Sequence, residues 1–226
     1  GLGLLFSLLP MLFGRRMGCG GILLILVIGF FIMNRGMLSL GGQGGNAGAG
    51  AGGGGANVAC DTQAERFACN VFGSTHEVWS QIFQREGRQY SRPSLNFFTD
   101  QNQSGCGAAQ SAMGPFYCPV DHGVYLDTAF YNELSQRFGA AGDAAQAYVV
   151  AHEVGHHIQT LTGISDQVRQ AQARAGEAQG NALQVRMELQ ADCYAGVWAK
   201  LARTQDGQPV LEPGDVEEAM RAANAI

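Results

Sequence analysis

Three side chains within one short segment have the types and the spacing of a metal-dependent hydrolytic site. His152, Glu153 and His156 form the pattern His-Glu-x-x-His. Residues four apart share one face of an α-helix, so His152 and His156 can bind a single cation between them. Glu153 follows the first histidine and can reach a water activated by that cation, as a general base must. On a helix, this segment therefore predicts a zinc-dependent hydrolase.

The surrounding sequence predicts the helix that this pattern needs, over about residues 143–162. Asp143 and Gln146 resemble a capping box at its start, and Gly163 suits the position that follows its end. Gly155 has no side chain, so another helix or strand can approach the turn that carries the histidines.

A second helix, predicted over about residues 181–204, carries a pair of carboxylates. Zinc in a hydrolytic site takes three protein ligands and keeps one position open. Glu188 and Asp192 are four residues apart on a face that is otherwise small and apolar, where carboxylates without partners are costly. We expect Glu188 to be the third ligand, and Asp192 to accept the ring N–H of His152. The alternative is that Glu188 pairs with Arg186 or with solvent.

No spacing rule selects a donor for the negative oxygen that develops during hydrolysis of a peptide. Five residues could supply one, although each is more simply explained as structural: Tyr117, Tyr125, Tyr148, His157 and Tyr194. The remaining aromatic and imidazole groups have ordinary explanations as well. We expect His76 and His122 on the surface, and Trp79 and Trp198 in the core.

The rest of the globular part predicts an α+β fold. Apolar residues at helical spacing predict a helix over 61–87, and a further short helix is expected over 128–138. Residues 94–127 predict short strands, including a hairpin that turns at Asp121-His122-Gly123. These strands are candidates for the edge along which an extended peptide would bind. A terminal helix is expected after Pro213-Gly214.

Cysteines indicate an oxidising compartment. Cys60 and Cys69 are close in sequence, as are Cys106 and Cys118, so two local disulfides are possible; buried free thiols are the alternative. The sequence has no Cys-x-x-Cys pair of the kind found in zinc ribbons. Cys193 follows Asp192 and so points about 100° further around the helix, and we expect it to be a packing residue off the metal-binding face. A buried thiol beside the site is the alternative, but a fourth protein ligand would close the metal to substrate.

The N-terminal residues 1–40 predict a membrane anchor. The uncharged run over about 17–34 approaches the roughly 20 apolar residues that cross a bilayer. A buried core helix and a cleaved signal peptide are the alternatives. Two arginines precede this run and one follows it, which places the N-terminus in the cytoplasm and the remainder outside. The anchor therefore predicts contact with membrane lipid.

Glycine-rich residues 41–57 predict a flexible linker, which leaves residues 58–226 as the catalytic domain. The net charge is −5 and no basic run is present, so nucleic acid is not an expected partner. The expected partner is a polypeptide substrate, and the oligomeric state is left open.

Three segments together resemble a known family: GCGAAQSAMGPFYCPVDHGVYLD, AQAYVVAHEVGHHIQ and NALQVRMELQADCYAGVWA. They are similar to the bacterial putative neutral zinc metallopeptidases, and the combination of HExxH with a Glu on a second helix looks like a glutamate-zincin. The resemblance implies a zincin-like α+β domain with a small antiparallel sheet and an HExxH helix, preceded by one transmembrane helix. It also implies a bacterial membrane protein. Together with the arginines that flank the apolar run, this predicts a single-pass protein of the inner or cell membrane with its catalytic domain on the extracytoplasmic side.

The residues and the resemblance predict the same activity, hydrolysis of peptide bonds with Zn²⁺ as cofactor. Glu153 would take a proton from the activated water and later pass it to the leaving amine. The alternative is a catalytically silent, zinc-stabilised module that binds or regulates a partner at the membrane. Intact Glu153 favours the enzyme, because binding of zinc does not itself need this residue. A third interpretation is an amidase that uses the same chemistry.

Overall fold

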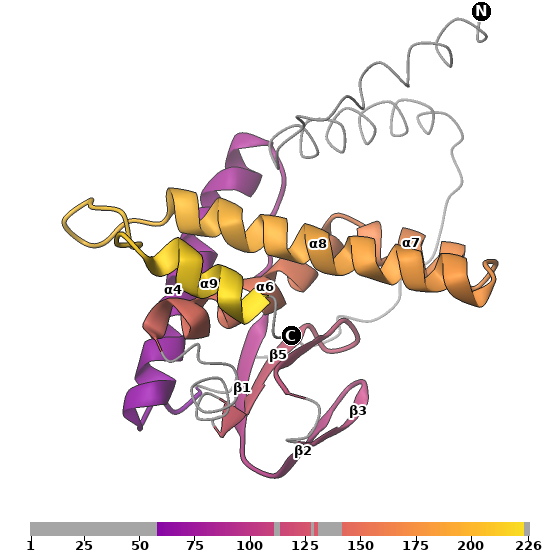
Figure 1. Cartoon of the computed structure of the whole chain (residues 1–226), viewed down its shortest axis with the longest axis horizontal. Coiled ribbons are helices and arrows are strands. Elements are labelled where there is room, and N and C mark those ends of the chain that lie inside the picture. The colour runs from indigo at the N-terminus through magenta and orange to yellow at the C-terminus, as the bar shows by residue number, and fades with distance from the viewer. Residues whose placement is uncertain (1–57, 111–113, 128, 131–141, 224–226) are drawn as a thin grey trace, which may run out of the picture. The chain divides into compact units, whose positions relative to one another are not determined.

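Five helices and two small sheets make up the part of the chain that the computed structural model describes (Figure 1). That part comprises residues 58–110, 114–127, 129–130 and 142–223, all within one compact unit, Gly54–Ile226. The elements in chain order are α4 Gln63–Arg85, β1 Ser94–Phe98, β2 Gln101–Ser104, β3 Gly107–Gln110, β4 Phe116–Cys118, β5 Gly123–Asp127, α6 Asp143–Leu161, α7 Ile164–Gln172, α8 Glu177–Leu201 and α9 Asp215–Ala223. The predicted α+β class is confirmed.

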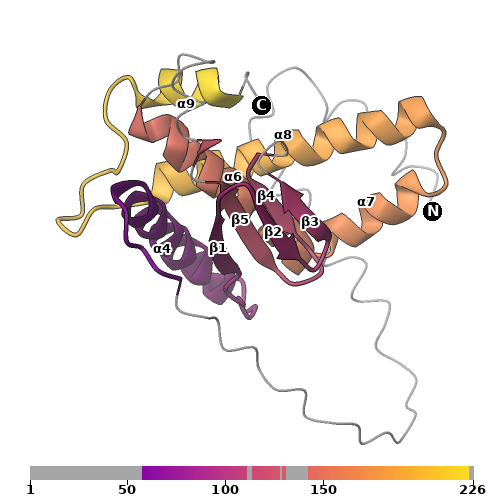
Figure 2. The ribbon, with the colours of Figure 1, turned by 90° about the horizontal axis from the view of Figure 1, so that it is seen from below.

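The helix α6 is the central element of this unit. It contacts α4, α7, α8 and α9 and also the strands β4 and β5 (Figures 1 and 2). Most of its side chains are buried, including Val149, Val150, Val154 and Ile158. An element that is covered on nearly every side holds its side chains in fixed positions. The α6 helix is therefore a rigid support for any site that it carries.

The three-stranded sheet has the order β1-β5-β4. Strands β4 and β5 form the predicted antiparallel hairpin, with Cys118 opposite Gly123 and His122 at a positive φ of 55° in the turn. Strands β1 and β5 are parallel, with Ser94 opposite Gly123, because the β2–β3 hairpin and β4 lie between them in the chain. The sheet is thus mixed, and the expectation of an antiparallel sheet was wrong for this pair.

The predicted helix over 143–162 is confirmed as α6, but its predicted start was wrong in detail. Gly142 is the N-cap and makes no side-chain cap bond, so Asp143 and Gln146 do not form a capping box. The backbone N–H of Ala145 instead donates to Oε1 of Glu218, on α9, at 2.9 Å. A carboxylate from a distant element therefore stabilises the positive end of α6. At the other end, Gly163 follows the C-cap with a φ of 77°, as predicted.

The remaining helices match their predictions unevenly. The helix expected over 61–87 is α4, and it begins with a capping box formed by Thr62 and Glu65. The helix expected after Pro213-Gly214 is α9. The helix expected over 181–204 is α8, which begins four residues earlier and ends at Leu201. The α7 helix, which is nine residues long and buries no side chain, was not predicted. Nearly all of the short helix expected over 128–138 lies outside the described residues.

Both predicted disulfides are confirmed, Cys60–Cys69 and Cys106–Cys118. The second attaches the β2–β3 turn to the end of β4, the strand next to the HExxH helix. No helix among the described residues is long and apolar enough to cross a membrane. The predicted anchor over 1–40 and the predicted linker over 41–57 lie outside those residues, and both stay predictions.

Candidate metal centre

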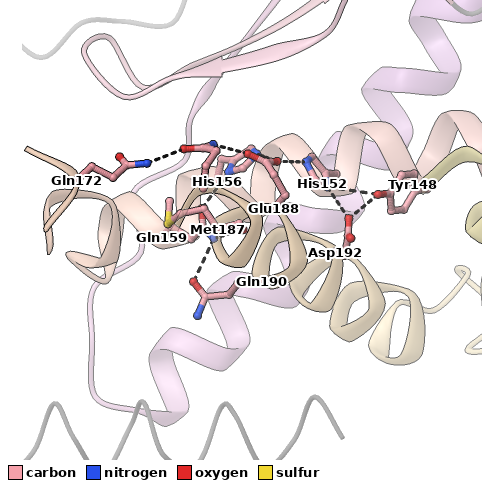
Figure 3. Close-up of polar contacts among 10 residues, drawn as sticks. Tyr148, His152, His156, Gln159, Gln172, Met187, Glu188, Gln190 and Asp192 are labelled. Atoms are coloured by element: carbon pink, nitrogen blue, oxygen red, sulfur yellow. Dashed lines mark hydrogen bonds and ion pairs between the residues drawn. The ribbon is translucent and has the colours of Figure 1, made fainter. Parts of the chain in front are cut away.

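The structure brings His152 and His156 of α6 together with Glu188 of α8 (Figure 3). Oε2 of Glu188 lies 3.3 Å from Nε2 of His152 and 3.2 Å from Nε2 of His156. Zinc bound tetrahedrally at 2.0–2.1 Å from each ligand would separate its ligand atoms by about 3.3–3.4 Å. Both separations are therefore those expected for a zinc ion that Glu188 shares with each histidine, and all three ligand atoms lie within 4.8 Å of one another.

Contact between two small residues lets α6 and α8 approach closely enough to form this group. A Cβ placed on Gly155 would lie 2.9 Å from the carbonyl oxygen of Ala191 and 3.1 Å from its Cα. Real Cβ atoms do not come that close to backbone atoms, so only glycine fits at this position. Gly155 precedes His156, and Ala191 precedes Asp192 on α8. The prediction that Gly155 permits a close approach at the turn that carries the two histidines is confirmed.

A carboxylate and a phenol fix His152 on its Nδ1 side, which is opposite the nitrogen that faces Glu188. Nδ1 of His152 lies 2.9 Å from Oδ1 of Asp192, and the Tyr148 hydroxyl donates to the same oxygen at 2.5 Å. Asp192 thus lies where the sequence analysis placed it. Tyr148 had been named as a possible oxyanion donor but expected to be structural, and the structure makes it a partner of Asp192. Its position one helical turn before His152 is the sequence signal that could have identified this role.

The corresponding partner of His156 is the side-chain amide of Gln159, which the sequence analysis missed. Gln159 is completely buried, and its Oε1 lies 2.9 Å from Nδ1 of His156. The amide nitrogen of Gln159 donates to the Met187 carbonyl oxygen at 2.8 Å and to Gln190 Oε1 at 3.1 Å. Because the nitrogen is engaged with acceptors, the oxygen must face His156 and accept its Nδ1–H. Gln159 therefore connects the second histidine to the turn of α8 that carries Glu188.

Glu188 is held by a chain of glutamines at the more open side of the group. Its Oε1 accepts from Gln184 Nε2 at 2.6 Å, and Gln172 of α7 donates to Gln184 Oε1 at 3.3 Å. The side chain of Glu188 is 43% exposed, whereas that of His152 is only 9% exposed. The unpredicted helix α7 thus contributes to the orientation of the acidic ligand.

These outer contacts decide which atoms are available to a metal. Both histidines donate through Nδ1, so in the neutral ring the lone pair is on Nε2, which faces Glu188. Two lone pairs and a carboxylate oxygen that converge in this way repel one another unless positive charge lies between them. The donor set is two imidazoles and one carboxylate, the set of open catalytic zinc sites. The residues present therefore fit zinc.

The electrostatics of the three groups agree with this assignment. Burial lowers the pKa of His152, but hydrogen bonds to Asp192 and Glu188 outweigh burial and raise that pKa to about 10. The pKa of His156 is also raised, since Glu188 and Glu153 outweigh the effect of burial. Hydrogen bonds from both histidines hold the pKa of Glu188 far below its ordinary value. The site thus attracts positive charge, which protons or a metal ion can supply.

Glu153 is buried beside the two histidines, with 7% of its surface exposed. Burial raises the pKa of its carboxyl group, and the charges of His156 and His152 partly oppose that rise. A general base works best when its pKa is near the working pH, so an upward shift suits a glutamate in this role. Glu188, and not Glu153, faces the Nε2 atoms of the two histidines. The carboxylate of Glu153 is therefore available to accept a proton.

The other residues named as possible oxyanion donors have structural partners. The Tyr117 hydroxyl lies 3.0 Å from Nδ1 of His157, and Nε2 of His157 donates to the Ser91 carbonyl oxygen at 2.7 Å. The Tyr125 hydroxyl donates to Asp121 at 2.7 Å. Tyr194 packs edge-on against Trp79. The structure therefore favours none of the five candidates as an oxyanion donor.

The remaining sequence assignments are partly confirmed. Trp79 and Trp198 are buried, as predicted. His76 and His122 are half-buried rather than on the surface, because their rings pack against Tyr90 and His157 respectively. Cys193 is half-buried and is not a member of the metal-binding group.

Comparisons with known proteins agree with this chemistry. The family model described as "Putative neutral zinc metallopeptidase" matches residues 7–226. The chain is 49% identical over 166 residues to the Escherichia coli K12 protein YpfJ, which covers 74% of this chain and 57% of YpfJ. It is 44% identical over 176 residues to the Mycobacterium bovis protein Mb2605, which covers 72% of this chain and 57% of Mb2605.

Both relatives carry the description "uncharacterized", so neither supplies an activity. The matched part spans 57% of the length of each of them. No solved structure matches the chain. The family model covers nearly the whole chain and agrees with the donor set described above. The chain belongs to the putative neutral zinc metallopeptidase family.

Proposed function

We propose that this protein is a zinc-dependent peptidase. The observation that carries the proposal is the position of Glu188 Oε2, 3.3 Å from His152 Nε2 and 3.2 Å from His156 Nε2, while the Nδ1 atoms of both histidines have other partners. These three residues would hold the zinc ion and leave its fourth position open. Zinc held there would polarise a peptide carbonyl and lower the pKa of a water molecule.

Glu153 is the proposed general base. Its carboxylate would accept a proton from the attacking water and transfer that proton to the nitrogen of the leaving amine. Its burial supports this role, because burial raises its pKa and excludes bulk water that would compete for the proton. Asp192, Tyr148 and Gln159 act as positioning residues, since they fix the tautomers and orientations of the two histidines.

The proposed fold is zincin-like, and the substrate would bind along β4. Among the described strands, β4 is an edge of the three-stranded sheet and also contacts α6, the helix that carries the site. An extended peptide can add hydrogen bonds to such an edge. This placement would bring the peptide backbone alongside Glu153.

We further propose that the enzyme is anchored in a bacterial membrane and acts outside the cytoplasm. The two disulfides support an oxidising location, and the apolar run over 17–34 supports an anchor. A domain tethered by residues 41–57 would act on polypeptides near that membrane.

The test compares the purified chain with Glu153→Gln and with Glu177→Gln, a matched change of an exposed glutamate on α8. We expect peptide hydrolysis to fall by at least 10²-fold in Glu153→Gln, because general-base catalysis contributes about that much or more. Hydrolysis should be unchanged in Glu177→Gln. All three proteins should bind one zinc ion, measured by elemental analysis. Equal hydrolysis in Glu153→Gln and the wild type would remove the proposed mechanism, and zinc binding without hydrolysis in the wild type would favour a silent module.

A further inference from the structure

A pocket of about 600 Å³ lies directly beside the metal-binding group, between α6, α8 and α9. This volume is within the range of about 300–1,000 Å³ that is typical of small-molecule sites. Its wall includes Tyr148 and Asp192, the two residues that hold His152. The pocket therefore adjoins the candidate metal centre through Tyr148 and Asp192, which contact His152 and also line the pocket.

The spacing along both helices shows that the pocket continues the face that carries the metal ligands. On α6, Tyr148 and Ala144 precede His152 by one and two turns. On α8, Asp192, Gly196 and Lys200 follow Glu188 at steps of four residues. The two helices thus extend the same surface in the same direction, away from the ligands. Figure 3 shows the first part of this surface, from His156 past His152 to Tyr148 and Asp192.

The chemistry of the wall suits an apolar occupant. Small residues of α6 and α8 form the floor, and α9 contributes Val216 and Met220, which are 53% and 60% exposed. The polar atoms nearest the metal centre are already bonded to each other, since Tyr148 donates to Asp192. Large apolar side chains that stay exposed beside a catalytic centre mark a binding surface. The cations Lys200 and Arg203 lie toward the end of α8, remote from Glu188.

Helical geometry gives the distance from the scissile bond. Tyr148 and Ala144 lie about 6 and 12 Å along α6 from His152, at 1.5 Å per residue. An extended peptide advances about 3.3 Å per residue. A side chain that fills the pocket would therefore belong to a residue about two to four positions from the bond at the metal.

We propose that this pocket binds an apolar side chain of the polypeptide substrate and so sets the cleavage preference. This inference rests on the proposed peptidase function, and it adds the class of substrate: chains with a large aliphatic or aromatic residue near the cleaved bond. Continuity with the metal centre, through Tyr148 and Asp192, selects a substrate side chain over other occupants.

The test fills the pocket without disturbing the fold. A Cβ on Gly196 meets nothing within 4 Å, and the same is true of Gly73 on α4, outside the pocket. Gly196→Leu therefore places a side chain in the pocket, and Gly73→Leu is the matched control. A library of quenched fluorescent peptides, varied between Phe, Leu, Ala and Gly at four positions on each side of the scissile bond, is cleaved by wild type and both variants. Zinc content is measured in parallel.

We expect the wild type and Gly73→Leu to prefer Phe or Leu over Ala at one position, by at least tenfold in kcat/KM. Gly196→Leu should lose most of that preference and keep its zinc. Cleavage without an apolar preference, or an unchanged preference in Gly196→Leu, would overturn the inference while leaving the peptidase function intact. A dimer that Gly196→Leu abolishes, with an unchanged preference, would instead assign the pocket to a second copy of the chain.

Absence of all cleavage by the wild type would count against the proposed function and not against the pocket. Binding then decides: the Phe-containing and Ala-containing peptides are titrated against each zinc-loaded protein, by fluorescence anisotropy. Tighter binding of the Phe peptide that Gly196→Leu removes would support the pocket. Equal binding of the two peptides would overturn it.

Discussion

His156 and His157 are neighbours in sequence on α6, yet the structure gives them opposite chemistry. His156 turns Nε2 toward Glu188, and its pKa is raised because carboxylates outweigh burial. His157 is completely buried between the Tyr117 hydroxyl and the Ser91 carbonyl, and burial lowers its pKa to about 4. Both nitrogens of His157 are bonded to neutral groups, so its ring stays uncharged and structural. The comparison teaches that the hydrogen-bond partners of a histidine, and not its burial, decide whether it can bind a metal ion.

The largest loss of zinc affinity should come from removing the carboxylate of Glu188, which His156 faces. Glu188→Ala leaves two imidazoles and no carboxylate, so we expect zinc affinity to fall by more than the roughly 10- to 100-fold that loss of an outer partner costs. Isothermal titration with zinc measures it, and Glu177→Ala, an exposed change on the same helix, is the control. Full zinc affinity in Glu188→Ala would show that the third ligand is misassigned.

The second prediction concerns the dependence of stability on pH that His157 creates in zinc-free protein. Its pKa is lowered from 6.5 to about 4 on folding, so the unfolded chain binds the proton more readily. The neutral ring therefore contributes its full stability above pH 6.5, and that contribution is lost as the pH falls through 4. Between pH 6.5 and pH 4 the free energy of unfolding should fall by on the order of 3 kcal/mol because of this one buried histidine.

Replacing His157 by Gln, which does not titrate, should remove this part of the pH dependence. Urea unfolding of wild type and His157→Gln at several pH values between 7 and 4, both without zinc, measures the difference. Parallel curves for the two proteins would mean that His157 is not held neutral by its surroundings.

The smallest effect is expected at the outer partner of His156. Gln159→Leu keeps the size of the buried side chain but removes the acceptor of the Nδ1–H, so the ring loses its fixed tautomer. We expect zinc affinity to fall about 10- to 100-fold, with zinc still bound at saturation. Gln170→Leu, an exposed glutamine on α7, is the control. Unchanged affinity would reduce Gln159 to a contact between helices.

Much of the site could be predicted because its spacings are local. Residues four apart share a helix face whatever the tertiary fold, so His152 with His156 and Glu188 with Asp192 could be identified as pairs. Gly155 could be identified as a point of close approach because it has no side chain and lies next to His156. Gln159 was missed, and the structural partner of Tyr148 was not identified, since both roles depend on which nitrogen of each histidine faces the opposite helix. The short α7 helix was also missed.

The sequence by itself determined the donor types, the two helix faces that present them, the adjacent cysteine pairs and the α+β class. Each of these follows from local spacing or composition, which the printed chain contains. Only the tertiary structure decided that the two faces meet, that β1 runs parallel to β5, that Glu218 caps α6, and that a pocket extends from Asp192 beneath α9. These features join residues far apart in the chain, and the packing of side chains fixes such distances while local periodicity does not.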